Sequence, residues 1–168
     1  MPNMKQLISS HNKSVISKVN EPTDIEKKCN CQQPSTCPLP QNCLSSGIVY
    51  QATVTTDNSK ETYVGLTDTT FKERYGNHKN SFKDSRKRHA TKLSKYIWSL
   101  KDSGISYNLE WKVLSKRKAY LPISNRCNLC LREKYFIICK PEMASLNNRN
   151  ELATECMHRR KHLLVKPK

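Results

Sequence analysis

"VYQATVTTDNSKETYVGLT", residues 49–67, has the pattern of two short strands joined by a turn. "TDNSKE" supplies the polar residues that favour a turn, and the return strand "ETYVGLT" carries Tyr63, followed by Gly65. Alternate residues of the first strand share one face, and they are Ile48, Tyr50, Ala52 and Val54. The stretch therefore predicts a β-hairpin that pairs two tyrosines.

The segments after the hairpin alternate between helix and strand patterns. "TTFKERYGNHKNSF" predicts a helix that Thr67 or Asp68 can cap, and "TKLSKYIWSLK" predicts a second helix. "ISYNLEWKVL" alternates as a third strand, and "CNLCLREKYFIICK" predicts a helix that Pro141 limits. This order favours an α/β (α+β) domain with a small three-stranded antiparallel sheet flanked by helices.

Positive charge dominates the 168-residue chain. Its formal net charge is +16, from 30 Lys and Arg against 14 Asp and Glu. Between residues 71 and 118 there are 14 basic and 4 acidic side chains, and the tail from Cys156 adds five basic residues without an acid. Such clustering favours nucleic acid as the partner over a merely soluble charged surface.

Two further features of composition bear on where the chain works. It has no apolar run of about 18 residues, and its start lacks the apolar region of a secretory signal. We therefore expect no membrane association, and a nuclear or intracellular location in a reducing compartment. Eight cysteines in such a compartment favour zinc over disulfides. The sequence does not determine the oligomeric state.

A first group of cysteines lies in a Pro-rich stretch, 29–46, which is too irregular to build a core of its own. Four thiolates around Zn²⁺ would order this stretch, and the alternative is a disordered Cys-rich linker. The four ligands expected here are Cys29, Cys31, Cys37 and Cys43. Cys139, beside two isoleucines, belongs to no group and is expected to be a small core residue.

A second group starts with Cys127 and Cys130, which form a CxxC at the start of a predicted helix. Two of the residues Cys156, His158 and His162 would complete a tetrahedral Zn²⁺ site. Cys156 with His158 is the preferred pair, and His158 with His162 is the alternative. Both zinc sites are expected to be structural.

Three side chains carry the chemistry of a phosphate-cleaving site. Arg74 and His78 are four residues apart on a predicted helix, so they share a face. An arginine can stabilise charge on a phosphate, and a histidine can move a proton or hold a phosphate oxygen. Glu133 shares a helix face with three apolar residues, which is unusual for a carboxylate unless it is paired or bound to metal. The alternatives are solvated residues on a basic helix and a salt-bridged edge glutamate.

In this order, these residues resemble the motifs of the GIY-YIG nuclease family over about residues 47–150. "GIVY" (47–50) resembles the first tyrosine motif, and "YVG" (63–65) resembles the second. Because "GIVY" has one residue more than the family motif, either Val49 and Ile48 take the places of its first two residues or the strand starts with a bulge. Arg-x3-His, the later glutamate and "LNNRNEL" resemble the remaining motifs.

The resemblance implies a role for each matched residue. Tyr50 would deprotonate or position the attacking water and Tyr63 would have a positioning role, although the two could exchange. Arg74 would stabilise the phosphate and His78 would assist proton transfer. The resemblance further implies that Glu133 holds Mg²⁺ or Mn²⁺ and that Asn147, or alternatively Asn148, supports the site.

DNA is the expected partner, and the basic segment after the second tyrosine is expected to follow its backbone. The residues expected to contact nucleic acid are Gly65, Lys79, Lys83, Arg86, Lys87, Arg88, His89, Lys92 and Lys95.

Three cysteine-containing segments resemble the endonuclease domain of Penelope-like retroelements in particular: "CNCQQPSTCPLPQNC", "RCNLCLREKYFI" and "ELATECMHRRKHLL". In that family the domain follows a reverse transcriptase, so such a polymerase, fused or lost, is an expected partner. The resulting organisation is a linker or end of an upstream domain at 1–28, a zinc-binding segment at 29–46, a nuclease domain at 47–150 and a basic tail at 151–168.

Two other interpretations stay open. A zinc-dependent nucleic-acid-binding module with an inactive nuclease site would share the charge and the cysteines, without needing the arginine, histidine and glutamate. A zinc scaffold for protein partners would explain the cysteines but not the basic segment.

Overall fold

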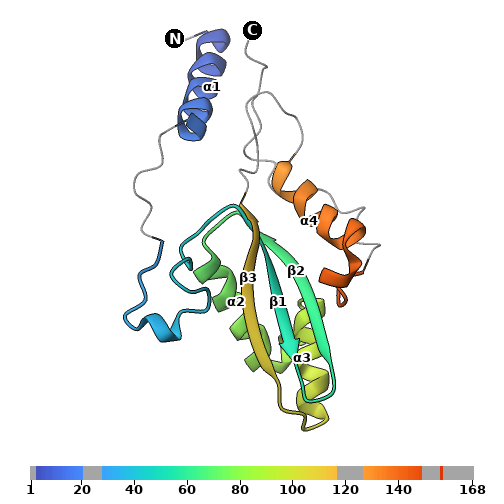
Figure 1. The fold of residues 1–168 in the computed structure, drawn as a ribbon. Helices are drawn as coiled ribbons and strands as arrows, with labels where there is room; N and C mark the ends of the chain where they lie inside the picture. Colours follow the sequence, from blue (N-terminus) through green and yellow to red (C-terminus); the bar gives the residue numbers. More distant parts are fainter. Residues whose placement is uncertain (1–2, 21–27, 117–126, 149–155, 157–168) are drawn as a thin grey trace.

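The tyrosine hairpin forms the middle and one edge of a three-stranded antiparallel sheet (Figure 1), which confirms the predicted sheet. The strands are β1 (Ile48–Thr55), β2 (Lys60–Thr67) and β3 (Asn108–Lys116), in the order β2-β1-β3. We describe them from a computed structural model, in which residues 3–20, 28–116, 127–148 and 156 are described.

The register of the sheet is regular on one side of β1 and irregular on the other. β1 and β2 pair without a break. Between β1 and β3 the register shifts, because Val49 lies opposite Ser115 whereas Tyr50 lies opposite Val113, so Leu114 is an extra residue in β3. For "GIVY" the sequence left a bulge at the start of the first strand as one of two alternatives, and the extra residue observed here lies in β3, not in β1.

Helices α2 (Phe71–Lys83) and α3 (Lys92–Asp102) cover one face of the sheet. Thr70 caps α2 by accepting a hydrogen bond from the backbone of Glu73, so the cap lies later than either predicted residue. The buried residues of this first core cluster come from the strands, both helices and the Cys-rich segment: Leu39, Ile48, Tyr50, Ala52, Val54, Tyr63, Phe71, Phe82, Leu93, Ile97 and Leu100.

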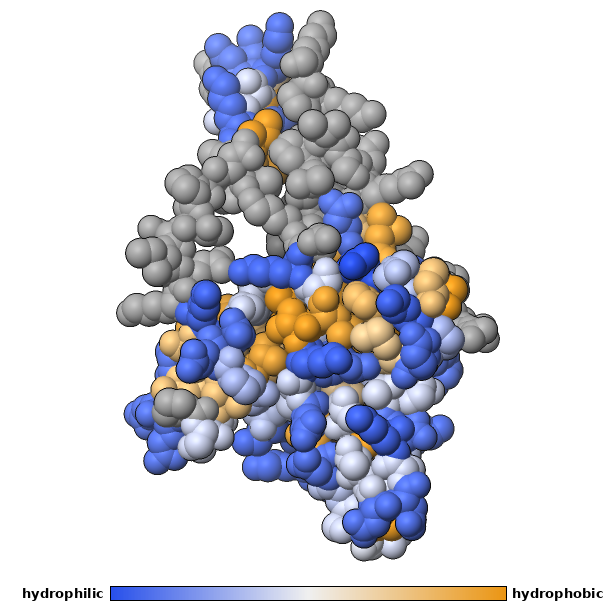
Figure 2. Space-filling model, in the orientation of Figure 1, coloured by the Kyte–Doolittle hydropathy of each residue, from blue (hydrophilic) through white to orange (hydrophobic). Residues whose placement is uncertain are grey.

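Helix α4 (Asn128–Cys139) packs against β2 and β1 on the opposite face, because its core partners include Val49 and Val64. In Figure 2, apolar residues (orange) gather over the sheet beside α4. Cys139 is exposed rather than part of the core. It follows the buried Ile137 by two residues, which places it about 200° around the helix.

The N-terminal segment contains a helix, α1 (Met4–Asn20), within residues 1–28, which are expected to be a linker or the end of an upstream domain. Short 3-10 turns are found at Pro34–Thr36, Ser85–Lys87 (η2) and Pro141–Met143. Within the described ranges, no helix has the length and apolar character needed to cross a membrane.

Candidate functional site

The phenol of Tyr50 joins the two residues that the sequence places one turn apart on α2. Its hydroxyl lies 2.8 Å from Nε2 of His78, and Nε of Arg74 donates a hydrogen bond to the same oxygen at 2.9 Å. Tyr50 has no exposed surface, His78 is 2% exposed and Arg74 is half-buried. Arg74 and His78 are therefore partners of one buried hydroxyl rather than solvated residues of a basic helix.

Gly65 makes room for this phenol. Tyr50 and Gly65 lie directly opposite each other in the β1–β2 pair. A Cβ atom at position 65 would lie 2.6 Å from the hydroxyl oxygen of Tyr50 and 3.0 Å from Cε1 of Tyr63. Gly65 is itself buried, which leaves little surface for the contact with nucleic acid that the sequence suggests. The glycine is needed here because Tyr50 lies across it.

Burial keeps Tyr50 and His78 uncharged. It raises the pKa of Tyr50 to about 12, against the opposing effect of the Arg74 charge. It also lowers the pKa of His78 to about 3, and the Arg74 charge adds to this effect. Because a guanidinium can only donate, we assign the hydroxyl proton of Tyr50 to the bond with Nε2 of His78, whose own proton is then on Nδ1.

Tyr63 and Glu133 surround the same guanidinium. Tyr63 is 8% exposed, and its ring centroid lies 6.2 Å from that of His78. Burial acts against the charge of Arg74, but the pKa of its guanidinium is raised because both tyrosines and Glu133 lie within electrostatic reach. The structure thus brings the two tyrosines, the arginine, the histidine and the glutamate of the sequence analysis to one place.

Glu133 reaches this place from α4. Its helix-face neighbours Leu129, Phe136 and Ile137 are buried, as expected, while Glu133 itself is half-buried. A half-buried carboxylate is a suitable oxygen ligand for a hard divalent cation. One carboxylate is enough for Mg²⁺ when substrate phosphate and water complete its ligand shell.

Asn147 pairs with the outer edge of β2. Its Oδ1 accepts a hydrogen bond from the backbone N–H of Val64, and its Nδ2 donates to the carbonyl oxygen of Val64, both at 2.8 Å. The backbone N–H of Leu146 donates to the carbonyl oxygen of Thr62 at 2.9 Å. Residue 147, and not the exposed residue 148, therefore holds the strand between Tyr63 and Gly65.

The four cysteines of the first group form one cluster, with all Sγ atoms within 4.8 Å of one another. The Sγ–Sγ distances are 3.7 Å for Cys29–Cys37, 3.7 Å for Cys31–Cys43 and 3.5 Å for Cys43–Cys29. Four thiolates around a tetrahedral Zn²⁺ are about 3.8 Å apart, given a Zn–S bond of about 2.3 Å. The cluster therefore has the donor set and the spacing of a four-thiolate metal site.

The segment that holds the first cluster is hydrogen-bonded to the start of α2. The backbone N–H of Lys72 donates to the carbonyl oxygen of Cys43 at 2.7 Å, and that of Phe71 donates to the carbonyl oxygen of Ser45 at 2.9 Å. The ammonium group of Lys72 also donates to Oδ1 of Asn30 at 2.7 Å. The Cys-rich segment thus binds backbone groups of the helix that carries the arginine and the histidine.

The second cluster contains Cys127, Cys130 and Cys156, again with Sγ atoms within 4.8 Å. Sγ of Cys130 lies 3.5 Å from that of Cys156. The predicted fourth ligand, His158, and its alternative, His162, lie outside the described residues. Three thiols fit a metal site that needs one more ligand.

Burial disfavours thiolates in both clusters. It raises the pKa of Cys31 to about 12, and it also raises the pKa of Cys43, Cys127 and Cys130. Cys29 is the exception, because the backbone N–H of Cys31 lowers its pKa to about 7. A bound cation reverses this preference, since a thiol that coordinates metal is deprotonated.

The basic residues expected to contact nucleic acid are mostly exposed, but some are paired within the chain. Those with exposed side chains are Lys79, Lys83, Arg86, Lys87, His89 and Lys95, whereas Arg88 and Lys92 are half-buried. Arg86 forms a two-point ion pair with Asp84, with both N–O distances at 3.1 Å. Nη2 of Arg88 lies 2.5 Å from Oδ2 of Asp102. Contact with a phosphate by either arginine would compete with these carboxylates.

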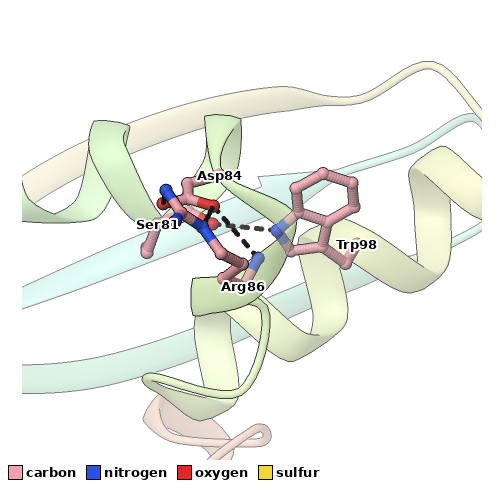
Figure 3. A network of polar contacts seen from close by, with 4 residues as sticks. All are labelled: Ser81, Asp84, Arg86 and Trp98. Carbon is pink, nitrogen blue, oxygen red and sulfur yellow. Dashed lines mark hydrogen bonds and ion pairs between the residues drawn. The ribbon is translucent and has the colours of Figure 1, made fainter.

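Trp98 links α3 to the last turn of α2, beside the basic loop between these helices (Figure 3). Its Nε1 donates to the carbonyl oxygen of Ser81 at 2.8 Å, next to the pair of Arg86 and Asp84. The guanidinium of Arg88 lies 5.7 Å from the Trp98 ring centroid, and the ammonium group of Lys101 lies 4.8 Å from it. The loop between α2 and α3 thus contacts α3 through Arg88 and Trp98, while most of its cations face solvent.

Comparison with protein-family models, with curated proteins and with solved structures gives no match for this chain. The function is therefore argued from the site itself.

Sequence analysis missed one residue of the site. Trp111, predicted as a strand residue, has its ring centroid 5.2 Å from that of His78 and 5.7 Å from that of Tyr50. Its place on the alternating face of β3 is a signal for burial toward the core, but periodicity does not say which helix residue it meets.

Proposed function

We propose that this chain is a metal-dependent DNA endonuclease of the GIY-YIG type, which cleaves or nicks phosphodiester bonds. One observation supports it above all: a buried tyrosine hydroxyl is bound by both Arg74 and His78, with Glu133 in electrostatic reach. Nothing in the packing of a simple sheet requires an arginine, a histidine and a glutamate around one phenol. A phosphate-cleaving site does require such groups.

Arg74 is the residue that binds the scissile phosphate in this proposal. Its Nε is used by Tyr50, so the N–H groups of its two Nη atoms remain for two phosphate oxygens. A guanidinium that binds two phosphate oxygens stabilises the negative charge that grows on the phosphate during attack.

Tyr50 and His78 are the proposed acceptors in the transfer of the proton from the attacking water. The phenol oxygen is the acceptor of that proton, and its own proton points to Nε2 of His78, which can take it up once the bound phosphate offsets the positive charge of Arg74. Arg74 favours this transfer because its charge lowers the pKa of the phenol, although burial outweighs it in the free chain. Since Tyr50 has no exposed surface, we expect Arg74 to shift when the phosphate binds and so admit the water.

Glu133 is the ligand for Mg²⁺ or Mn²⁺. When bound, such a cation would supply Lewis-acid stabilisation of the phosphate and of the departing 3′ oxygen. Asn147 holds the β2 edge, and so keeps Tyr63 and Gly65 in register with Tyr50.

The metal proposed for both cysteine clusters is Zn²⁺, in a structural role. DNA is the substrate that fits the exposed cations between α2 and α3. Target cleavage in a Penelope-like retroelement, beside a reverse transcriptase, is the biological setting that we propose from the resemblance of the cysteine-containing segments.

The test is nicking of supercoiled plasmid by the zinc-loaded protein, with Mg²⁺ or Mn²⁺ added. Glu133→Gln and Arg74→Lys should each lose at least about 100-fold in rate while DNA binding persists. Glu142→Gln, which changes an exposed carboxylate outside the site, is the matched control and should nick like the wild type.

The same assay distinguishes the nuclease from the alternative function. Charge and cysteines would also suit a zinc-dependent nucleic-acid-binding module. A zinc-loaded wild type that binds DNA but never nicks with either cation would establish the binding module and end the nuclease proposal.

A further inference from the structure

His78 lies in a box of aromatic rings. Its ring centroid is 5.2 Å from that of Trp111, 5.9 Å from those of Tyr50 and Phe82, and 6.2 Å from that of Tyr63. Three of the four walls are buried, whereas Trp111 is only half-buried on the edge strand β3. Trp111 is therefore the wall of the box that lies nearest to solvent.

The floor of the box follows from the sheet register. Ala52 lies opposite Tyr63 on one side and opposite Trp111 on the other, so the row across the three strands reads large, small, large. The small side chain of Ala52 leaves space over β1 between the larger side chains of Tyr63 and Trp111. The imidazole of His78 lies close to the rings of both. The box is thus a product of residue size at three paired positions.

We propose that Trp111 is a positioning residue of the catalytic site, which keeps water away from His78 and thereby preserves its hydrogen bond with the Tyr50 hydroxyl. The proposal rests on the function proposed above, because it gives His78 the task of accepting the phenol proton. Trp111 touches no reacting atom itself, and it acts through the histidine.

The charged and titratable groups that face His78 are few. They are Arg74 on its own helix, Tyr50 on β1 and Tyr63 on β2, while Phe82 and Trp111 offer apolar rings. The positive charge of Arg74 disfavours a second positive charge on the imidazole. If water entered beside His78, the imidazole could be protonated at mildly acidic pH, and a protonated imidazole cannot accept a hydrogen bond from Tyr50.

The first experiment follows the imidazole of His78 by NMR as the pH is lowered, and it needs no nuclease activity. In the wild type, the chemical shifts of the His78 ring should stay constant as the pH is lowered to about 4, because the ring stays neutral. In Trp111→Ala they should shift with a midpoint near the usual value of about 6.5. In Trp111→Phe, which keeps a ring in the wall, the midpoint should stay below about pH 5. Exposed His89 gives a reference signal in the same spectra.

The second experiment measures plasmid nicking by Trp111→Ala relative to wild type at each pH, so that pH effects common to both cancel. The ratio should fall about tenfold between pH 7.5 and pH 5.5, because a group with a pKa near 6.5 is then about nine-tenths protonated. Ile105→Ala, which shortens an exposed apolar side chain, should leave this ratio and the His78 signals unchanged.

The two experiments separate failure of this proposal from failure of the proposed function. If His78 in Trp111→Ala stays neutral to pH 4, or if the nicking ratio is independent of pH, the positioning role is overturned. If Trp111→Ala does not fold, Trp111→Phe decides: a His78 midpoint above that of the wild type but below about pH 5 supports the proposal, and a midpoint equal to that of the wild type overturns it. If the wild type never nicks, the proposed function fails whatever His78 does.

Discussion

The two helices that carry the candidate catalytic side chains both begin at a cysteine cluster, but they begin in different ways. α2 has its own cap in Thr70, and its first backbone N–H groups are bonded to the carbonyl oxygens of Cys43 and Ser45. α4 is capped by a cluster residue itself, because Sγ of Cys127 accepts a hydrogen bond from the backbone N–H of Cys130 at 3.5 Å.

This difference separates the site into two halves. Arg74 and His78 are fixed by a buried phenol and a large core, so their half is held by the fold. Glu133 lies one turn beyond Cys130 on a helix whose N-cap, Cys127, belongs to the second cluster. Metal loss at the second cluster should therefore affect the carboxylate half, whereas metal loss at the first should weaken the fold.

The largest effects are expected when one thiol is removed from each cluster. Cys43→Ser should lower the melting temperature by more than about 10 °C, because metal-binding energy at such a site is folding energy. Cys130→Ser should lower it less but reduce nicking at least about 100-fold. Zinc content, thermal unfolding and plasmid nicking measure these effects.

Cys139→Ser is the control for both variants, since Cys139 is exposed and belongs to neither cluster. It should match the wild type in all three measurements. Equal losses of stability in Cys43→Ser and Cys130→Ser would show that the first cluster does not stabilise the fold more than the second.

A second test concerns the half held by the fold. Gly65→Ala places a Cβ atom 2.6 Å from the Tyr50 oxygen, so the phenol or the strand must move. Such overpacking costs about 1–3 kcal/mol of unfolding free energy, and the displaced phenol should reduce nicking about 100-fold. Denaturant unfolding and nicking rates check both effects.

Gly76→Ala is the matched glycine variant, because nothing lies within 4 Å of a Cβ atom at that position on α2. It should stabilise the protein by up to about 1 kcal/mol, as alanine favours a helix. The idea that Gly65 serves close approach fails if the two variants behave alike.

The fold-held half should also make stability depend on pH. The pKa of His78 is about 3 in the folded chain, below the usual value of about 6.5 expected after unfolding. Between these values the unfolded chain binds the extra proton, so stability falls as the pH falls, by about 1.4 kcal/mol per unit. This contribution is fully present above about pH 6.5.

His78→Gln removes that contribution. The difference in unfolding free energy between wild type and variant should shrink by about 1.4 kcal/mol per pH unit from pH 6 to pH 4, measured by urea unfolding. A difference that stays constant over this range would mean that His78 is protonated alike in both states.

The smallest effect is expected at the other end of α2. Asp84→Asn releases Arg86 from its ion pair, so the arginine can turn to a phosphate. DNA affinity should rise a few-fold at low salt, and the salt dependence should steepen by about one phosphate contact. Lys87→Gln, on the same turn, should weaken binding and so calibrate the assay.

Local patterns in the sequence account for much of this structure. Alternation predicts the hairpin and the third strand, and helical spacing brings Arg74 and His78 to one side of α2. The spacing of the cysteines within each group also predicts that they cluster, as they do.

What the sequence did not supply depends on contacts between distant segments. The bulge at Leu114 and the row from Tyr63 through Ala52 to Trp111 follow from strand register, which no local period encodes. Thr70 was missed as the cap because Thr67 and Asp68 offer the same chemistry three and two residues earlier. The exposed position of Cys139 depends on which face of α4 meets the sheet.

The pairing of Asn147 with β2 also decides where this chain can be cut. With the segment that ends at Asn147 in place, part of the outer backbone of β2, at Thr62 and Val64, is hydrogen-bonded to it. A recombinant fragment that stopped before Ser145 would present these groups to any other extended chain, and open strand edges are where proteins aggregate. The shortest fragment that stays soluble should therefore extend at least to residue 147.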